Sequence, residues 1–382
     1  MAVRTTSEIM HVPFASLAHL HQDVAADLDR AWRDALNESA FIGGPWVERF
    51  ERDWAAYCGV GHAVGVANGT DAIEIILRAL GIGRGDEVIL PANTFIATAE
   101  AIILAGAEPR FVDVDPETLL VTPDAIRGAI GPKTSAIIAV PLYGNMPSRR
   151  EITELASSRG LVVIEDAAQA HGSTWDGASA GSFGVAGSFS FYPGKNLGAL
   201  GDAGAIVTND ERLADRARTL ANHGRPAGSH HSHELQGRNS RLDSIQAAFL
   251  SAKLPRLDSW NEARRAVVAR YTQLLDPEVG RQVRVDERAV SSYHLFVIQV
   301  SDRDDLRRGL AELGIETGVH YPVPCHLNEP YRQFASDRLP VTERASEEVL
   351  SLPLFPHMRP RQVEYVAGCL NELVVGRGIR GS

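Results

Sequence analysis

Two stretches of the chain decide its fold: LVVIEDAAQAHG at residues 161–172 and GSFSFYPGKNLGALGDAG at residues 187–204. The first opens with a short apolar run that ends at Asp166, and such a run is typical of a strand buried inside a sheet. The second surrounds Lys195 with glycine, serine and aromatic residues, which indicates a loop. Because open parallel sheets bind ligands beyond the carboxyl ends of their strands, we expect Asp166 at the ligand-binding edge.

Short apolar runs also precede these stretches, and helical patterns lie between them. Ile73, Ile76, Leu77 and Leu80 share one face of a helix over residues 71–80, and a further helix is predicted over residues 150–160. Apolar strands that alternate with helices predict an α/β fold with a largely parallel sheet covered on both faces. The strands are expected at Glu87–Pro91, Arg110–Val114, Ala136–Val140 and Leu161–Asp166.

The pattern changes after about Arg241. A long helical region over residues 243–275 is interrupted at Pro255, and a strand is expected at Tyr293–Val300, followed by more helices. Residues 227–237 are expected to form a loop. We therefore predict two units: a large domain over residues 1–250, which includes an N-terminal arm, and a smaller C-terminal α+β domain over residues 251–382.

Composition excludes several classes of protein. The chain has 382 residues and a net charge of -10, which argues against non-specific binding of nucleic acid. Its cysteines, Cys58, Cys325 and Cys369, are too few and too scattered for a disulfide framework or a zinc site, and no metal is expected. The first residues lack the apolar stretch of a signal peptide, and no run reaches membrane-spanning length, so the cytoplasm is the expected location.

Lys195 and Asp166 together fit one cofactor. Pyridoxal 5'-phosphate needs a lysine amine to hold it as a Schiff base and a carboxylate beside its pyridine nitrogen, which keeps the ring protonated. Taken alone, a lysine in a glycine-rich loop is usually a surface residue, and an acid at a strand end is often a loop cap or a magnesium ligand. The pair favours the cofactor.

A phosphate site is predicted at NGTDAI, residues 68–73. Gly69 and Thr70 lie at the start of the predicted helix, where free backbone amides and the helix dipole favour an anion. The plainer alternative is an ordinary N-cap formed by Asn68 or Thr70. The PGKN sequence around Lys195 is not a nucleotide-hydrolase phosphate loop, because the first glycine and the following Ser or Thr of that pattern are missing.

The chain resembles the DegT/StrS-type sugar-nucleotide aminotransferases, which belong to the fold type I pyridoxal-phosphate enzymes. The resemblance implies an aspartate aminotransferase-like large domain with a mostly parallel, seven-stranded sheet. It runs along nearly the whole length. Its landmarks are VANGTDAIEIILRALGIGRGDEVILPANTFIATAEAI, AEPRFVDVDPETL, VIEDAAQAHGS, SFSFYPGKNLGALGDAG, RNSRLDSIQAAFLSAKL and TGVHYPVPCHLNEPY.

The resemblance also implies roles for single residues. Lys195 is expected to carry the cofactor and then to move protons, and Asp166 to pair with the pyridine nitrogen. Gln169 is expected to bind the 3-hydroxyl of the ring, and Phe95 to stack on it. The phosphate is expected to be held by Gly69, Thr70 and Ser190, and by Asn239 of a neighbouring subunit, which implies a homodimer with shared active sites.

His320 and Tyr321 are the expected substrate-binding residues, because HYPVP resembles the segment that faces the sugar in relatives that act at C3 of a deoxyhexose. We therefore expect transfer of an amino group from L-glutamate to a nucleotide-linked keto-sugar such as a dTDP-3-keto-6-deoxyhexose. Amination at C4 is the main alternative. Aldol cleavage, desulfuration or a regulator without turnover are further ones, and Lys195 argues against the dehydratases that carry histidine at this position.

Overall fold

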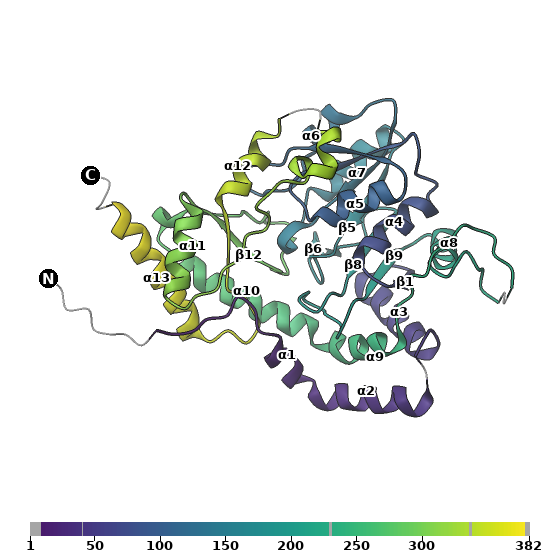
Figure 1. The fold of residues 1–382 in the computed structure, drawn as a ribbon, viewed down its shortest axis with the longest axis horizontal. Helices are drawn as coiled ribbons and strands as arrows, with labels where there is room; N and C mark the ends of the chain where they lie inside the picture. Colours follow the sequence, from purple (N-terminus) through teal and green to yellow (C-terminus); the bar gives the residue numbers. More distant parts are fainter. Residues whose placement is uncertain (1–8, 40, 229–230, 336–337, 379–382) are drawn as a thin grey trace.

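A seven-stranded sheet forms the centre of the protein in the computed structural model, which describes residues 9–39, 41–228, 231–335 and 338–378 (Figure 1). The strand order is β1-β9-β8-β5-β4-β2-β3, and β9 alone runs antiparallel to its neighbours. The expectation of a mostly parallel sheet is therefore confirmed. The strands are β1 (His62–Val66), β2 (Glu87–Pro91), β3 (Glu108–Val112), β4 (Thr134–Ala139), β5 (Val162–Asp166), β8 (Ala186–Ser190) and β9 (Gly204–Thr208).

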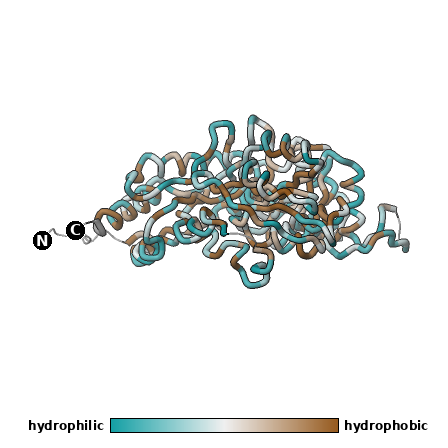
Figure 2. The backbone as a smooth tube through the Cα atoms, turned by 90° about the horizontal axis from the view of Figure 1, so that it is seen from above, coloured by the Kyte–Doolittle hydropathy of each residue, from teal (hydrophilic) through white to brown (hydrophobic). Residues whose placement is uncertain are grey.

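Helices cover both faces of this sheet. Successive residues of one strand enter opposite layers: Val88 and Leu90 pack in one hydrophobic core, and Ile89 packs in the other. Apolar segments accordingly run through the middle of the molecule (Figure 2). The first core contains residues of α4 (Gly69–Ala79), α5 (Ile96–Leu104) and α8 (Glu211–Ala221); the second contains residues of α3 (Pro45–Cys58), α6 (Pro123–Ala129), α7 (Arg149–Ser158) and α9 (Ser244–Lys253).

Helix α4 shows how the sequence sets these elements. Ile73, Ile76 and Leu77 are fully buried, and each such side chain contributes about 1.5–3 kcal/mol when it leaves water. The Asn68 side chain accepts a hydrogen bond from the Asp71 amide at 2.8 Å, so the helix begins at Gly69. The N-cap alternative considered for Asn68 is therefore real, and it leaves the first amides of α4 free to bind a ligand.

The long helical region breaks where proline predicts. Helix α9 ends at Lys253, a 3₁₀ turn η2 (Leu254–Arg256) holds Pro255, and α10 (Leu257–Leu274) continues the path. Beyond it lies a second sheet of order β10-β12-β13, with its own hydrophobic core. Its elements are β10 (Arg281–Gln282), β12 (Phe296–Gln299), β13 (Val349–Leu352), α11 (Arg303–Glu312), α12 (Pro340–Glu348) and α13 (Pro360–Gly378).

The N-terminal region contacts both units. Helix α2 (Ala25–Glu38) packs on α9, whereas Val12 pairs with Ile315 and belongs to the core of the smaller unit. The division at residue 250 remains a proposal, with α10 extending from the large unit to the small one. The remaining elements are α1 (Leu17–Asp23), η1 (Leu142–Gly144), β6 (Thr174–Trp175), β7 (Ala178–Ser179), η3 (Pro277–Val279), β11 (Ala289–Val290), η4 (Cys325–Leu327) and η5 (Glu329–Phe334).

The bounds of several expected strands differ from the structure. Strand β4 begins at Thr134 and not at Ala136, and the strand expected at Tyr293–Val300 is the shorter β12. Strand β3 begins two residues before Arg110, because parallel pairing with β2 aligns Glu87 with Glu108, and Val114 instead bridges to Val121. The loop expected over residues 227–237 has no helix or strand where it is described; residues 229 and 230 lie outside the described residues. No helix in the described part of the chain is both long and apolar enough to span a membrane.

Candidate active site

A cavity of about 580 Å³, here called the Lys195 cavity, opens at the carboxyl ends of the central strands. The structure brings nine of the ten predicted site residues to its walls. Asn239 is absent from the lining and is exposed on the segment before α9. The nine are Gly69, Thr70, Phe95, Asp166, Gln169, Ser190, Lys195, His320 and Tyr321.

Lys195 lies in the loop that follows β8. Burial lowers its pKa to about 8, although the nearby Asp166 carboxylate acts in the opposite direction. The chain has three lysines, and burial also lowers the pKa of Lys253 to about 8. Lys253 donates a hydrogen bond to the Gly198 carbonyl at 2.6 Å and is not part of the cavity wall, while Lys133 is exposed. Position therefore singles out Lys195 as the available amine.

The anionic side of the site is Asp166, the last residue of β5. Its Oδ2 accepts a hydrogen bond from Thr98 Oγ1 at 2.6 Å, and Thr98 in turn contacts Thr94 Oγ1 at 2.8 Å. Burial raises the pKa of Asp166, while Thr98, the Ala168 amide and Lys195 oppose that rise. A cationic ring nitrogen in the cavity would favour the ionised carboxylate further.

An anion site lies at the N-terminus of α4. Gly69 packs so closely on β8 that an added Cβ would lie 2.8 Å from Ser190 Cβ, and only glycine fits without displacement. The glycine lets the first amides of α4 and the Ser190 hydroxyl line the same end of the cavity. Free amides at a helix N-terminus suit a phosphate group. The residues therefore fit the phosphate of pyridoxal phosphate.

Gln169 and Tyr321 are joined in one hydrogen-bond network. Gln169 Oε1 accepts a hydrogen bond from the Tyr143 amide at 2.7 Å, and Gln169 Nε2 donates to the Tyr321 hydroxyl at 3.0 Å. Tyr143, which has a φ of 62°, also donates its hydroxyl to the His320 carbonyl at 2.5 Å. The network fixes the amide of Gln169 at the cavity wall.

His320 is held as a neutral imidazole. Its Nδ1 lies 2.8 Å from Ser351 Oγ, and its ring stacks on Phe14 with 5.7 Å between the centroids. Burial, followed by the charge of Lys195, lowers the pKa of His320 to about 4. A neutral ring at this wall can exchange hydrogen bonds with sugar hydroxyls without adding charge.

Phe95 forms the outer part of the cavity. Its side chain is 51% exposed, and its ring centroid lies 5.5 Å from that of Tyr321. An exposed ring at the mouth of a cavity has a free face for a flat ligand. Stacking of Phe95 on the cofactor remains a prediction.

Sequence reasoning missed three residues of this site. Thr98 lies in the first turn of α5, and its role depends on contact with Asp166 across the fold. His294 and Arg264 line the cavity from segments remote in sequence. Nothing in the local patterns around them indicates a ligand site, because burial and missing partners are properties of the folded chain.

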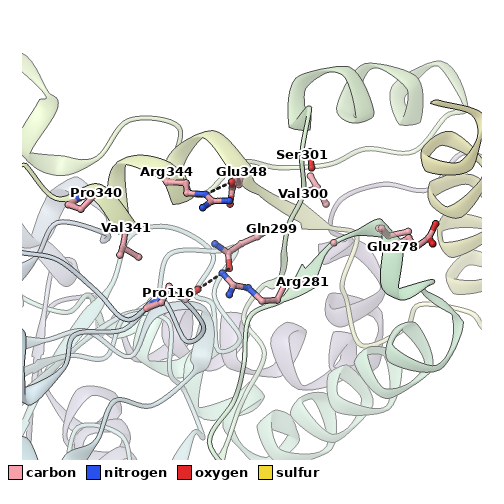
Figure 3. Close-up of a pocket in the computed structure, with 12 residues that line it drawn as sticks. Pro116, Glu278, Arg281, Gln299, Val300, Ser301, Pro340, Val341, Arg344 and Glu348 are labelled. Carbon is pink, nitrogen blue, oxygen red and sulfur yellow. Dashed lines mark hydrogen bonds and ion pairs between the residues drawn. The ribbon is translucent and has the colours of Figure 1, made fainter. Parts of the chain in front are cut away.

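A second hollow lies between the two units, near Pro116, β12 and α12 (Figure 3). Its two arginines already have partners: Arg281 donates to the Pro116 carbonyl at 2.7 Å, and Arg344 pairs with Glu348 at 2.6 Å. Its lining contains no lysine, histidine, cysteine or tyrosine. The Lys195 cavity is therefore the candidate active site.

Comparison with known proteins agrees with this site. The model of the DegT/DnrJ/EryC1/StrS aminotransferase family matches residues 22–371. The chain belongs to this family. Among relatives, a pleiotropic regulatory protein of Geobacillus stearothermophilus is 44% identical, with 94% of this chain and 97% of the relative covered. A dTDP-3-amino-3,4,6-trideoxy-alpha-D-glucose transaminase of Streptomyces venezuelae is 42% identical, with 96% and 97% covered.

Solved structures of similar aminotransferases share the fold. DesV of S. venezuelae, crystallised in complex with a ketimine intermediate, has a TM-score of 0.92 and 42% identity, with 95% of this chain and 98% of that chain covered. NtdA of Bacillus subtilis, with bound cofactor PMP, has a TM-score of 0.91 and 34% identity, with 97% and 86% covered. The protein is an aminotransferase, and its cofactor is pyridoxal 5'-phosphate.

Proposed function

We propose that this aminotransferase transfers the amino group of L-glutamate to the C3 carbonyl of a nucleotide-linked keto-sugar, such as a dTDP-3-keto-6-deoxyhexose. The observation that carries the proposal is one cavity that holds Lys195 and Asp166 together with His320 and Tyr321. The Streptomyces venezuelae relative named for a 3-amino sugar nucleotide supports the choice of substrate class and of C3.

Different residues of the cavity have different roles in the proposed reaction. When bound, the cofactor supplies a protonated ring that withdraws electrons from the substrate carbon. Asp166 stabilises that ring charge, Gln169 fixes the ring's orientation, and the Gly69 and Thr70 amides bind the phosphate. Lys195, with a pKa of about 8, is neutral often enough near neutral pH to accept a proton from carbon and return it.

We also propose that two copies of the chain share their active sites. Asn239 is exposed and lies outside the Lys195 cavity of its own subunit. The neighbouring Arg238 forms ion pairs with Asp71 and Glu74 of α4, which fix the segment that carries Asn239. A fixed, exposed amide is well suited to reach the phosphate site of a second copy.

One experiment tests the reaction and its regiochemistry together. The purified protein is incubated with cofactor, L-glutamate and a panel of 3-keto and 4-keto deoxysugar nucleotides, and the products are analysed by mass spectrometry and NMR. The proposal expects 2-oxoglutarate and a 3-amino sugar nucleotide. A 4-amino product would show that the amino group is transferred to C4 and would contradict transfer to C3. If no sugar is turned over and L-glutamate does not change the cofactor absorbance, the protein would instead be a regulator. The Geobacillus relative is named as a regulatory protein.

A further inference from the structure

Arg264 is a buried cation on the wall of the Lys195 cavity. Its side chain comes from α10, and the residue is 5% exposed. One terminal nitrogen donates to the Leu354 carbonyl at 3.2 Å, and Nε has no hydrogen-bond partner among the described residues. Burial alone lowers its pKa to about 10, and no carboxylate raises it, so the guanidinium keeps its charge at neutral pH.

Two partly buried arginines of this chain have acidic partners, whereas buried Lys253 donates only to the Gly198 carbonyl and does not line the cavity. Arg218 pairs with Glu51 at 2.7 Å, and Arg238 pairs with two acids of α4. Removing a guanidinium from water without an opposing charge is unfavourable. A guanidinium has five N–H donors, and one backbone carbonyl cannot accept hydrogen bonds from all of them. Arg264 therefore lacks an anionic partner that would offset the cost of burying its charge.

His294, which lines the cavity together with Arg264, does not provide this anion. Asn196 donates from Nδ2 to Asn261 Oδ1 and to the Ser292 carbonyl, so its Oδ1 accepts from His294 Nδ1 at 3.1 Å. This contact fixes the His294 tautomer with a free lone pair on Nε2. Burial, then the charges of Lys195 and Arg264, lowers the pKa of His294, which keeps its ring neutral.

The two acids of the cavity are also accounted for. Asp166 accepts the Thr98 hydroxyl and interacts with Lys195, and Asp202 is exposed at the edge. Neither carboxylate contributes to the pKa of Arg264. No carboxylate among the described residues therefore pairs with Arg264, and a molecule that enters the cavity can supply the anion.

We propose that Arg264 binds a carboxylate of the amino donor. The inference rests on the proposed function, since it assigns a residue to the donor of that reaction. An amino acid that delivers its amine near Lys195 brings a carboxylate into the same cavity, and guanidinium groups match carboxylates with two parallel hydrogen bonds. The cofactor phosphate has a separate site at Gly69, Thr70 and Ser190. Arg264 thus selects an anionic donor over a simple amine.

Two substitutions of Arg264 distinguish the effect of its charge from that of its hydrogen bond to the Leu354 carbonyl. Arg264→Gln keeps a donor for the Leu354 carbonyl but removes the charge, and Arg264→Lys keeps the charge. Arg270→Met is the matched control, because Arg270 lies on the same helix in a half-exposed ion pair with Glu364. Circular dichroism and cofactor titration verify that each variant folds and loads.

The readout is donor binding, measured apart from the sugar reaction. The half-saturating L-glutamate concentration is taken from the change in cofactor absorbance, and the binding of glutarate, an unreactive dicarboxylate, is measured by calorimetry. Arg264→Gln is expected to weaken both by roughly tenfold to a hundredfold, the value of a charged hydrogen bond. Arg264→Lys should retain part of the affinity, and Arg270→Met should stay within about twofold of wild type.

Three results would overturn the assignment. The first is unchanged affinity of folded Arg264→Gln for L-glutamate and glutarate. The second is a loss confined to the keto-sugar nucleotide, which would assign Arg264 to the diphosphate. The third needs no variant: if the neutral diamide of glutarate competes with L-glutamate on the wild-type protein as well as glutarate does, charge is not recognised. If no amino acid changes the cofactor absorbance of the wild-type protein, the proposed transaminase function is contradicted, whatever the role of Arg264.

Discussion

Replacing Asp166 by asparagine should change the proton affinity of Lys195 in the cofactor-free protein. The two residues meet in the Lys195 cavity, where burial lowers the pKa of Lys195 to about 8 and the Asp166 charge raises it. Asparagine has nearly the shape of aspartate and can still accept the Thr98 hydrogen bond, so the cavity should persist. With the opposing charge removed, the pKa of Lys195 should fall below its wild-type value.

The magnitude follows from the pKa of Lys195, about 8, and the ordinary pKa of lysine, about 10.4. At pH 7.5, an amine of pKa 8 is neutral in about a quarter of molecules, whereas an ordinary lysine is neutral in about one in a thousand. Each further unit of decrease corresponds to about 1.4 kcal/mol. The wild-type amine should therefore react at neutral pH, and the Asp166→Asn amine should do so at lower pH still.

Competitive labelling can follow each lysine separately, because the chain has only Lys133, Lys195 and Lys253. The cofactor-free protein is treated with a trace of an amine acylating reagent between pH 5 and pH 11, an interval chosen to span both values, and the peptides are quantified by mass spectrometry. The Lys195 curve should have its midpoint near 8 and move to lower pH in Asp166→Asn, while the other two stay in place. A Lys195 midpoint near 10.4, or no movement in the variant, would refute the electrostatic account.

Three further predictions concern the cofactor and the subunits. Lys195→Ala should lose at least about a hundredfold in turnover while circular dichroism and melting stay close to wild type; retained turnover in a steady-state assay would contradict its role as the proton carrier. Equal mixtures of Lys195→Ala and Asn239→Ala subunits, unfolded and refolded together, should recover about a quarter of wild-type activity, because half of the dimers would hold one intact site. Activity no higher than that of the separate variants would argue against shared sites. Tyr321→Phe removes the hydroxyl that accepts the Gln169 amide at 3.0 Å, and should weaken cofactor affinity in a fluorescence titration by about 0.5–1.5 kcal/mol; an unchanged affinity would show that Gln169 does not depend on Tyr321.

Local patterns were enough to predict the central elements of the fold. The strand at Glu87–Pro91 has the expected bounds, and the strand that ends at Asp166 begins one residue later than expected. Both are apolar runs whose ends are marked by polar or small residues. Strand β3 was misplaced by two residues because its register depends on pairing with β2, which the residues of β3 alone do not specify.

Strands β1, β8 and β9 had no comparable signal. The β8 stretch contains glycine and serine, and β9 begins with Gly204, which lies so close to Asn68 that an added Cβ would lie 2.5 Å from its backbone. Their small residues serve close packing between elements. A pattern based on apolar runs therefore misses them, although the family resemblance led us to expect the seven-stranded sheet.

Some residues of the candidate site could likewise be predicted from the sequence, and others could not. Residues on strand ends and helix starts, such as Asp166 and Gly69, were predictable because their position in a short motif fixes their place at the sheet edge. Arg264 and His294 were not, since their significance lies in burial, in a missing partner and in contacts across the fold. Asn239 was expected to act on another subunit, and its role remains a prediction.

Lys195, and neither of the other two lysines, is expected to hold the cofactor. Reduction of the cofactor-loaded protein with borohydride, followed by digestion and peptide mass spectrometry, tests it directly. A phosphopyridoxyl group is expected on the peptide that contains Lys195, with Lys133 and Lys253 unmodified. Modification of Lys253 in place of Lys195, or no stable attachment at saturating cofactor, would contradict it.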